Sequence, residues 1–246
     1  MNRAMDLTGR VCLVTGASRG IGQAIALELA AAGGDIAVNF RSDEAAARSV
    51  ASRVAALGRR VLLVRADVSD SNDVSRMLAE IEQDLGPVDV LVNNAGIGLK
   101  RTIDELTEAE FDQTIAVNLK SAFLCTQAVL PKMRARKWGR IVNISSGAAR
   151  GAGEIGVHYN AAKAGMEGLT RGYAMRVAGE GITVNSVAPS LIATDMASAI
   201  EDSAINRVPV RRMGRVEEVA QATLMAISND FITGQTIPVN GGKHLI

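Results

Sequence analysis

The chain has 246 residues, of which 48% are hydrophobic and 22% are charged, a composition typical of globular proteins and unlike that of disordered ones. Its 27 Lys and Arg residues balance 26 Asp and Glu residues, so its charge gives no reason to expect a nucleic acid or an anionic membrane as a partner. We also expect no signal peptide, because no suitable apolar run opens the chain, and no membrane span, because no apolar run approaches the roughly 20 residues that cross a bilayer.

Short apolar runs alternate with helical patterns along the whole chain. Strands are expected at Val11–Val14, Ile36–Val38, Val61–Val64, Val88–Val92, Arg140–Ile144, Ile182–Val187 and Thr236–Val239. Helical patterns lie between them, at about 24–30, Glu44–Leu57, Asn72–Leu85, about 107–133 with a possible interruption, about 157–178, and Val216–Ile227. This alternation predicts an α/β protein, a Rossmann fold in which a doubly wound, seven-stranded parallel sheet has helices on both faces.

No linker, repeat or low-complexity stretch divides the chain. We therefore predict a single domain over residues 1–246, with a cofactor-binding half at about 8–140 and a catalytic and substrate-binding half at about 141–246. The two cysteines, Cys12 and Cys125, lie far apart inside apolar runs and match neither a metal-ligand spacing nor a disulfide framework. A reducing, cytoplasmic location without a bound metal is the expectation.

Glycines mark the turn that leads from the first strand into the first helix. Gly16, Gly20 and Gly22 do not match the G-x-G-x-x-G dinucleotide fingerprint. The N–H groups at the start of a helix nevertheless attract anions, and glycines allow a pyrophosphate to approach the main chain. We interpret the turn as a dinucleotide phosphate site; the alternative is that the glycines only permit a tight turn.

The residues at the end of the second strand indicate which nucleotide would bind. An acidic residue there favours NAD, whereas a nearby arginine accommodates the 2′-phosphate of NADP. This strand ends Asn39-Phe40-Arg41-Ser42, with no carboxylate before Asp43, and Arg19 in the glycine turn can reach the same corner. We predict NADP(H) rather than NAD(H); the alternative is that Arg41 is a solvated loop residue.

Tyr159 and Lys163 lie four residues apart at the beginning of an expected helix. This spacing places both side chains on one helical face. A cation near a phenol favours the phenolate and lowers the phenol pKa, so the pair could donate and accept a proton near neutral pH. The alternative is an exposed lysine beside a half-buried tyrosine.

Several motifs occur together in a fixed order, and through them the chain closely resembles the short-chain dehydrogenase/reductase family over essentially its whole length. The motifs are Thr15–Gly22, Asp67-Val68, Asn93–Gly96, Asn118, Ile144–Ser146, Tyr159 with Lys163, and Val187–Pro189. The resemblance implies an oxidoreductase that uses a nicotinamide cofactor and, by analogy with other members, assembles as a homotetramer.

The resemblance also implies a catalytic set of Asn118, Ser146, Tyr159 and Lys163. Tyr159 would be the general acid in ketone reduction, and Lys163 would hold the nicotinamide ribose and depress the phenol pKa. Ser146 would donate a hydrogen bond to the substrate carbonyl oxygen, with Ser145 as its rival for that role. Asn118 would fix a water that extends a proton relay through Lys163.

The cofactor contacts follow from the same resemblance. Asp67 and Val68 would contact the adenine, Asn93, Ala95 and Gly96 would line the cofactor, and Ile192 and Thr194 would touch the carboxamide beside Pro189. The full predicted cofactor site comprises Gly16, Ser18, Arg19, Gly20, Ile21, Gly22, Asn39, Arg41, Ser42, Asp67, Val68, Asn93, Ala95, Gly96, Tyr159, Lys163, Pro189, Ile192 and Thr194.

Within the family, the ending Ile232–Gly242 favours the bacterial 3-oxoacyl-acyl-carrier-protein reductases of fatty acid biosynthesis and the acetoacetyl-CoA reductases. The substrate would then be a 3-oxoacyl thioester. One alternative is a dehydrogenase of another small alcohol, a sugar or a steroid. A different class of alternative is a dinucleotide-binding sensor without turnover, which would have no need of the full catalytic set.

Three features bear on the partner. The family's usual Pro-Gly is Pro189-Ser190 here, and Glu180 stands where carrier-protein reductases tend to have a basic residue. The run Lys132–Arg140 holds five cations and could dock an acidic carrier or a CoA phosphate; we favour the simpler reading that these cations complement a helix C-terminus.

Two further segments are expected to enclose the substrate. Residues 190–214 form the expected lid, in which Met196, Ile200, Ile205, Val208 and Met213 suggest an apolar pocket. Arg211 and Arg212 are candidate contacts to an anionic tail, and Gly147–Gly156 is the expected opposite wall.

Overall fold

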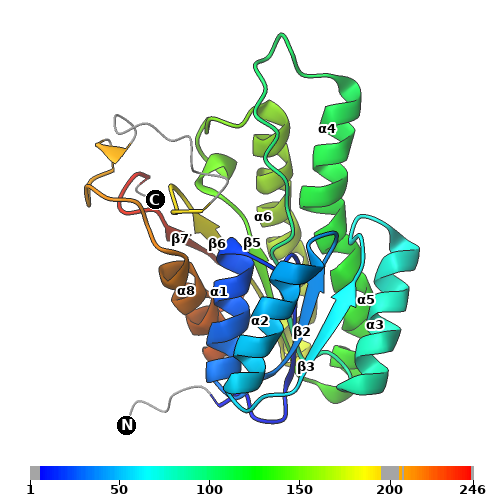
Figure 1. Cartoon of the computed structure of the whole chain (residues 1–246). Helices are drawn as coiled ribbons and strands as arrows, with labels where there is room; N and C mark the ends of the chain where they lie inside the picture. Colours follow the sequence, from blue (N-terminus) through cyan, green and yellow to red (C-terminus); the bar gives the residue numbers. More distant parts are fainter. Residues whose placement is uncertain (1–5, 195–204, 207, 245–246) are drawn as a thin grey trace.

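The computed structural model of this protein describes residues 6–194, 205–206 and 208–244. Within them, seven parallel strands form one sheet in the order β3-β2-β1-β4-β5-β6-β7 (Figure 1). The strands are β1 (Val11–Val14), β2 (Asp35–Phe40), β3 (Val61–Arg65), β4 (Val90–Asn93), β5 (Gly139–Ile144), β6 (Ile182–Pro189) and β7 (Thr236–Val239). The predicted α/β fold with a seven-stranded parallel sheet is confirmed.

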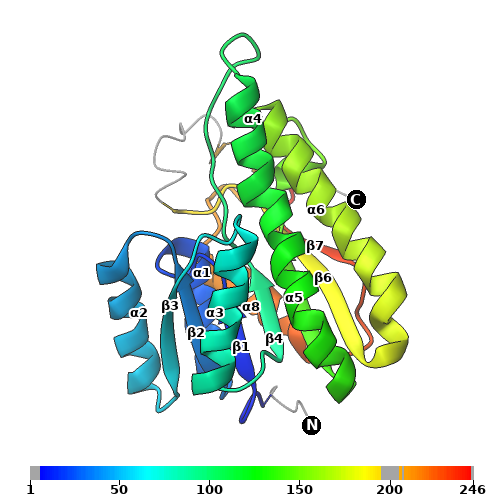
Figure 2. The same ribbon diagram turned by 90° about the vertical axis from the view of Figure 1, so that its right-hand side faces the viewer.

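Helices cover both faces of the sheet. On one face lie α1 (Gly20–Ala31), α2 (Glu44–Ala56) and α8 (Val216–Ser228); on the other lie α3 (Ser71–Asp84), α5 (Ser121–Arg136) and α6 (Val157–Val177) (Figures 1 and 2). Successive strand residues point to opposite faces, so Val14 joins the core under α1 and α8, whereas Leu13 joins the core under α3 and α5. No helix in the described ranges combines the length and apolarity needed to cross a bilayer.

A long helical run projects beyond the sheet (Figure 2). It consists of α4 (Glu108–Ile115), the π-helical turn η1 (Ala116–Lys120) and α5. Thr107 and Glu110 begin it with reciprocal side-chain-to-backbone hydrogen bonds, a capping box that satisfies two N–H groups at the helix start. The interruption expected in the 107–133 tract is therefore the π turn, and Asn118 lies within it.

Several boundaries differ from the sequence prediction; β2, for example, spans Asp35–Phe40 rather than Ile36–Val38. The fourth strand begins at Val90 rather than Val88, since the Asp89 carboxylate accepts a hydrogen bond from the Val11 N–H at 3.1 Å and lies 3.4 Å from the Arg10 guanidinium. The first helix begins at Gly20, before the first apolar residue of its periodic pattern. The Asp89 contacts are of a kind that hydrophobic periodicity does not report.

Candidate active site

The predicted site residues lie at the carboxyl ends of the strands from β3 across the sheet to β6. β1 pairs with both β2 and β4. The strand order therefore runs from β1 to β3 on one side and from β4 to β7 on the other. Open α/β sheets bind ligands in the crevice beside such a reversal of strand order. The glycine turn after β1, Asn93–Gly96 after β4, and Ser146 after β5 all lie at this edge.

Tyr159 meets Ser146 there. Tyr159 lies in the first turn of α6 and is 8% exposed, and its phenol is close enough to the Ser146 hydroxyl for that hydroxyl to lower the phenol pKa. The Ser146 oxygen also accepts a hydrogen bond from the Ala148 N–H at 3.1 Å, which caps the short 3-10 turn η2 (Gly147–Ala149). Two hydroxyl groups that can donate hydrogen bonds are thus placed side by side.

The rival serine points elsewhere. The Ser145 hydroxyl is buried and donates to the Lys163 carbonyl oxygen at 3.2 Å and to the Glu167 carboxylate at 3.4 Å. Successive residues at the end of a strand face opposite sides, so only one of the two serines can face Tyr159. The structure gives that position to Ser146.

Lys163 is buried beneath this pair. Its ammonium donates a hydrogen bond to the Ile144 carbonyl oxygen at 2.8 Å and lies 5.7 Å from the centre of the Tyr159 ring. Burial lowers the pKa of Lys163 to about 8. Burial also raises the pKa of the Tyr159 phenol, and the hydrogen bond with Ser146 opposes that rise. The expected depression of the phenol pKa is therefore not what this structure shows, because desolvation disfavours the phenolate.

Asn118 uses its side chain to hold the loop after β4. Its Oδ1 accepts from the Ile97 N–H at 2.7 Å, and its Nδ2 donates to the Ile97 carbonyl at 2.8 Å. Gly96 makes this approach possible, since a Cβ there would lie 2.9 Å from the Asn118 Oδ1. The amide is thereby committed to backbone, so a water held by Asn118 would have to be held through its main chain. π turns of this kind are frequent at functional sites.

The glycine turn has the shape of an anion site. Gly16 and Gly20 have φ values of +61° and +56°, in the left-handed region that other residues rarely adopt. No side chain caps the N-terminus of α1 at Arg19, so the first N–H groups of the helix, which have no partner within it, remain the ready donors of the turn. Ser18 and Ile21 lie in the same turn.

Two asparagines build the turn. The Asn39 side chain accepts from the Gly16 N–H at 3.1 Å and donates to the Val64 and Ala66 carbonyls at 3.3 and 3.2 Å. The Asn94 amide donates to the carbonyls of Thr15 and Gly16 at 2.9 and 3.1 Å. Asn39, a predicted cofactor contact, thus gives its side chain to the backbone of the turn, and Asn94, named only as part of the Asn93–Gly96 motif, was not among the predicted cofactor contacts.

The remaining predicted contacts follow β3, β4 and β6. Some of them are buried in the core, and others lie beside the glycine turn. Asn93 and Val68 are buried, and the Asn93 amide donates to Asn143 at 2.8 Å, so its side chain faces the core. Gly16 packs closely on Ala95, whose Cα would lie 2.9 Å from an added Cβ. Thr194 lies over the glycine turn, where its methyl group would be 3.7 Å from a Cβ at Gly20.

Arginines gather where β2 and β3 end. The Arg41 Nε lies 3.3 Å from the Asp67 carboxylate, and the Arg65 Nε donates to the Arg41 carbonyl at 3.1 Å. With Arg76 they line a cavity of about 350 Å³, whose other lining residues are Ala66, Asp67 and Asp73. Burial acts to raise the pKa of Asp67, but hydrogen bonds from Ser69 and the Arg41 charge bring it below its usual value. Ser42 is exposed nearby.

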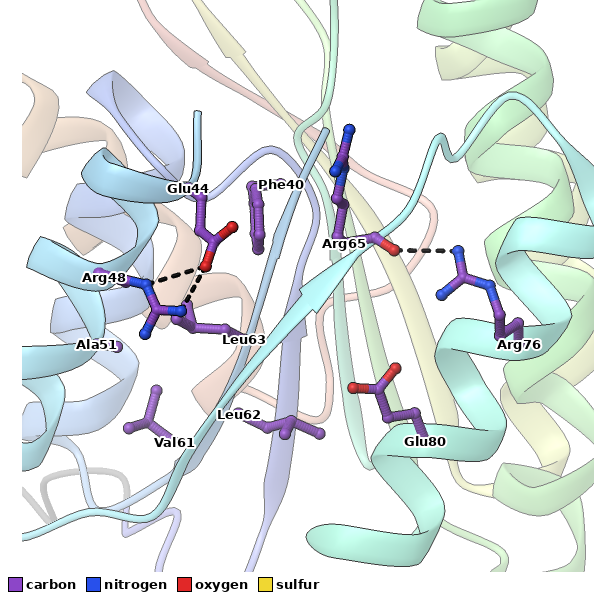
Figure 3. A pocket seen from close by; sticks show the side chains of 10 residues that line it. All are labelled: Phe40, Glu44, Arg48, Ala51, Val61, Leu62, Leu63, Arg65, Arg76 and Glu80. Carbon is purple, nitrogen blue, oxygen red and sulfur yellow. Dashed lines mark hydrogen bonds and ion pairs between the residues drawn. The ribbon is translucent and has the colours of Figure 1, made fainter. Parts of the chain in front are cut away.

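A second cavity, of about 510 Å³, follows the open edge of the sheet (Figure 3). It runs along β3 between α2 and α3. Glu44 pairs with Arg48 on one side, and Arg76 donates to the Arg65 carbonyl at 3.1 Å on the other. Charged side chains beside an edge strand discourage pairing with another chain, so these residues protect the edge.

The predicted substrate-binding segments are partly described. Residues 195–204 and 207, and with them Met196 and Ile200, lie outside the described residues. Val208 is buried, Ile192 is bridged to Gly214, and Ser190 donates its N–H to the Val239 carbonyl beside Pro189. Arg212 forms two hydrogen bonds with Glu218, and Arg211 donates to the Asn206 carbonyl.

Four of the five cations of the 132–140 run, Lys132, Arg134, Arg136 and Arg140, have partners within the chain. Lys132 pairs with Glu82 and Arg136 with Asp89. Arg134 makes two hydrogen bonds with Glu180, so the acidic residue noted in the sequence is neutralised locally. The run ends at the start of β5, whereas Ser146 follows that strand, and six strand residues span about 20 Å. The run therefore lies at the opposite end of the sheet from the predicted catalytic residues.

Comparison with known proteins agrees with this geometry. The short chain dehydrogenase family model matches residues 10–204. The chain belongs to the short-chain dehydrogenase family. It is 40% identical over 241 residues to a 3-oxoacyl-[acyl-carrier-protein] reductase FabG of Staphylococcus aureus, covering 95% of this chain and 97% of that protein. It is 41% identical over 246 residues to nodulation protein G of Azospirillum brasilense, covering 97% and 99%.

Solved structures give the same assignment. A crystal structure of a candidate short-chain alcohol dehydrogenase from Sinorhizobium meliloti superimposes with a TM-score of 0.93 at 35% identity, covering 98% of each chain. Short-chain dehydrogenases use a nicotinamide dinucleotide, and the residues present fit one. The left-handed Gly20 and the start of α1, which no side chain caps, offer backbone donors to a pyrophosphate.

Sequence reasoning missed four contributors to this short-chain dehydrogenase site. They are Arg65 in the arginine corner, Asn94 under the glycine turn, the Arg150–Glu167 ion pair behind Ser146, and His244, whose ring lies 2.9 Å from where a Cβ of Gly151 would be. Each contact joins segments remote in sequence, so no local pattern announces it. His158, which adjoins Tyr159, is fully buried and hydrogen-bonded to the Leu99 carbonyl.

Proposed function

We propose that this chain is an NADP(H)-dependent reductase that converts a ketone to a secondary alcohol, with a 3-oxoacyl thioester as substrate. The observation that carries the reaction class is the adjacency of the Ser146 and Tyr159 hydroxyls beside buried Lys163, at the same sheet edge as the glycine turn. Relatives at 40% identity named as 3-oxoacyl-[acyl-carrier-protein] reductases support the thioester substrate.

The chain's own residues would handle charge and protons. A bound nicotinamide supplies the hydride. Ser146 and Tyr159 would each donate a hydrogen bond to the substrate carbonyl oxygen, where negative charge develops, and pre-placed donors stabilise such charge strongly. Tyr159 carries the proton that this oxygen needs, and its raised pKa keeps the phenol protonated at neutral pH. Lys163, whose pKa is about 8, would hold the ribose and exchange protons near neutrality.

The arginine corner supports NADP(H) over NAD(H). Arg41, Arg65 and Arg76 line one cavity with two carboxylates, those of Asp67 and Asp73. Guanidinium groups bind phosphate oxygens with paired hydrogen bonds, so a 2′-phosphate can add its charge to this cluster. Arg19 remains a proposed fourth contact from the glycine turn.

We also propose a homotetramer in the cytoplasm, with the acyl group carried by CoA or an acyl carrier protein. The support for assembly is that Phe111, Phe123 and Met175, on α4, α5 and α6, are exposed, and large exposed apolar side chains mark contact surfaces. Cys12 and Cys125 are buried and unpaired, which suits a reducing compartment.

The test is NADPH oxidation with acetoacetyl-CoA, repeated with a carrier-linked 3-oxoacyl group, with NADH and with a simple diketone. Turnover of thioesters with NADPH is the expected result. Turnover of the diketone alone would retain the reductase and reject the thioester substrate, and a preference for NADH would reject the role of the arginine corner. Absence of turnover with every ketone would reject the reductase.

A further inference from the structure

The segment that carries Ser146 has little secondary structure of its own. After β5 the chain makes one three-residue 3-10 turn and then continues irregularly to Gly156. The position of the Ser146 hydroxyl relative to Tyr159 therefore depends on what holds this segment against α6. Residues on α6 provide those contacts.

A buried carboxylate on α6 contacts the chain on both sides of Ser146. Glu167 is 5% exposed, and its Oε2 lies 3.1 Å from the Arg150 Nε. Its Oε1 accepts from the Ser145 hydroxyl at 3.4 Å, and that hydroxyl also donates to the Lys163 carbonyl. Glu167 follows Lys163 by four residues, so both lie on the face of α6 that meets β5.

This arrangement is a poor way to gain stability alone. Removing the Glu167 carboxylate from water is expensive, and the contact with Arg150, whose side chain is 39% exposed, offsets little of that cost because partly exposed ion pairs contribute little. The far end of the segment is held independently, because the Asn160 amide donates to the Gly151 carbonyl at 2.9 Å. The segment can thus remain attached to α6 without the ion pair.

We propose that Arg150 and Glu167 are positioning residues, which fix the Ser146 hydroxyl against Tyr159 by clamping the residues that flank Ser146. Ser145 transmits the constraint on one side and Arg150 on the other. The catalytic use of this geometry rests on the proposed reductase function, whereas the geometry itself does not. Misplacement of a catalytic group by about 1 Å can slow an enzyme up to about 100-fold.

The first test measures kcat and KM of Arg150→Leu, Glu167→Leu, the double variant and Arg150→Lys, each with thermal unfolding. Each single leucine variant should lose at least about tenfold in kcat with little change in KM or in NADPH affinity. The double variant should unfold at a higher temperature than either single leucine variant but should not recover kcat. Arg150→Lys should retain more of kcat than Arg150→Leu. Arg134→Leu, which breaks the exposed pair with Glu180, is the matched control and should leave kcat unchanged.

A second readout does not depend on turnover. In a Tyr173→Phe background, NMR titration of a ¹³C-labelled Tyr159 ring reports its pKa directly. Since the Ser146 hydrogen bond lowers that pKa, breaking the clamp should raise it further, and Arg134→Leu should not. Wild-type kcat in the double variant, or an unmoved Tyr159 titration in all clamp variants, would overturn the proposal. If the wild-type chain reduced no ketone but the clamp variants still raised the Tyr159 pKa, the reductase function would be rejected and the clamp retained.

Discussion

Asn118 and Ile97 are joined by two hydrogen bonds, in which the side-chain amide of Asn118 pairs with both the N–H and the carbonyl of Ile97. The amide therefore ties the π turn η1 to the loop after β4. A residue predicted for proton relay has a structural task at the same position.

Asn118→Ala is expected to destabilise the protein. It removes two buried hydrogen bonds, worth about 2 kcal/mol together, so thermal unfolding should occur about 4–8 °C lower. Asn118→Asp, which can still accept from the Ile97 N–H but cannot donate to its carbonyl, should lie between. Unchanged melting of Asn118→Ala would show that the two hydrogen bonds do not hold the loop.

Tyr159→Phe should lose about 10² to 10⁴-fold in kcat, the usual contribution of a proton donor. The substitution removes only the phenol hydroxyl and retains the buried ring, so folding and NADPH binding should persist. Thermal unfolding and cofactor titration of the same sample provide the control. Retention of most of the activity would assign the proton to another group.

Ser146→Ala and Ser145→Ala distinguish the two serines. Ser146→Ala should lower kcat by about 10² to 10³-fold, as for loss of one donor to a developing oxyanion. Ser145→Ala removes the contacts with the Lys163 carbonyl and with Glu167, which form one side of the clamp, so it should lower kcat by only about tenfold. The reverse order would mean that Ser145 faces the substrate during turnover.

Lys163 should make stability depend on pH. Burial lowers its pKa from 10.5 to about 8, so between these values the unfolded chain binds the proton more readily than the folded one. The penalty is complete below about pH 8 and is relieved as the pH rises toward 10.5. Lys163→Met carries no such penalty. The difference in free energy of unfolding between Lys163→Met and the wild type should therefore fall, to the disadvantage of the variant, by about 3 kcal/mol as the pH rises from about 8 to 10.5. A constant difference from pH 7 to 10.5 would contradict this.

Arg41→Ala and Arg65→Ala should each weaken NADPH binding by about 10- to 100-fold, which is the usual loss when a charged hydrogen bond is removed. NADH, which lacks the 2′-phosphate, should bind nearly as before. Arg53→Ala, in the last turn of α2, is the control. Equal losses for both nucleotides would mean that the arginines support the fold of the corner rather than read the phosphate.

Local patterns were sufficient for the elements of the fold and for part of the site. Alternating apolar runs predicted the strands, and the spacing of Tyr159 and Lys163 predicted their common helical face. Such periodicities are set by residues close together in the sequence, so they can be recognised before the packing of the chain is known. The resemblance to a family then named Ser146 and Asn118, but it could not say what their side chains contact.

The amino-acid sequence by itself thus determined the parallel sheet, the glycine turn and the placement of Tyr159 above Lys163. Only the tertiary structure decided that Ser146 and not Ser145 faces Tyr159. It also decided that the side chains of Asn39 and Asn118 form hydrogen bonds with the backbone, and that burial raises the pKa of the Tyr159 phenol. It also brought Arg150 to Glu167. These outcomes depend on burial and on contacts between distant segments, and both exist only once the chain is packed.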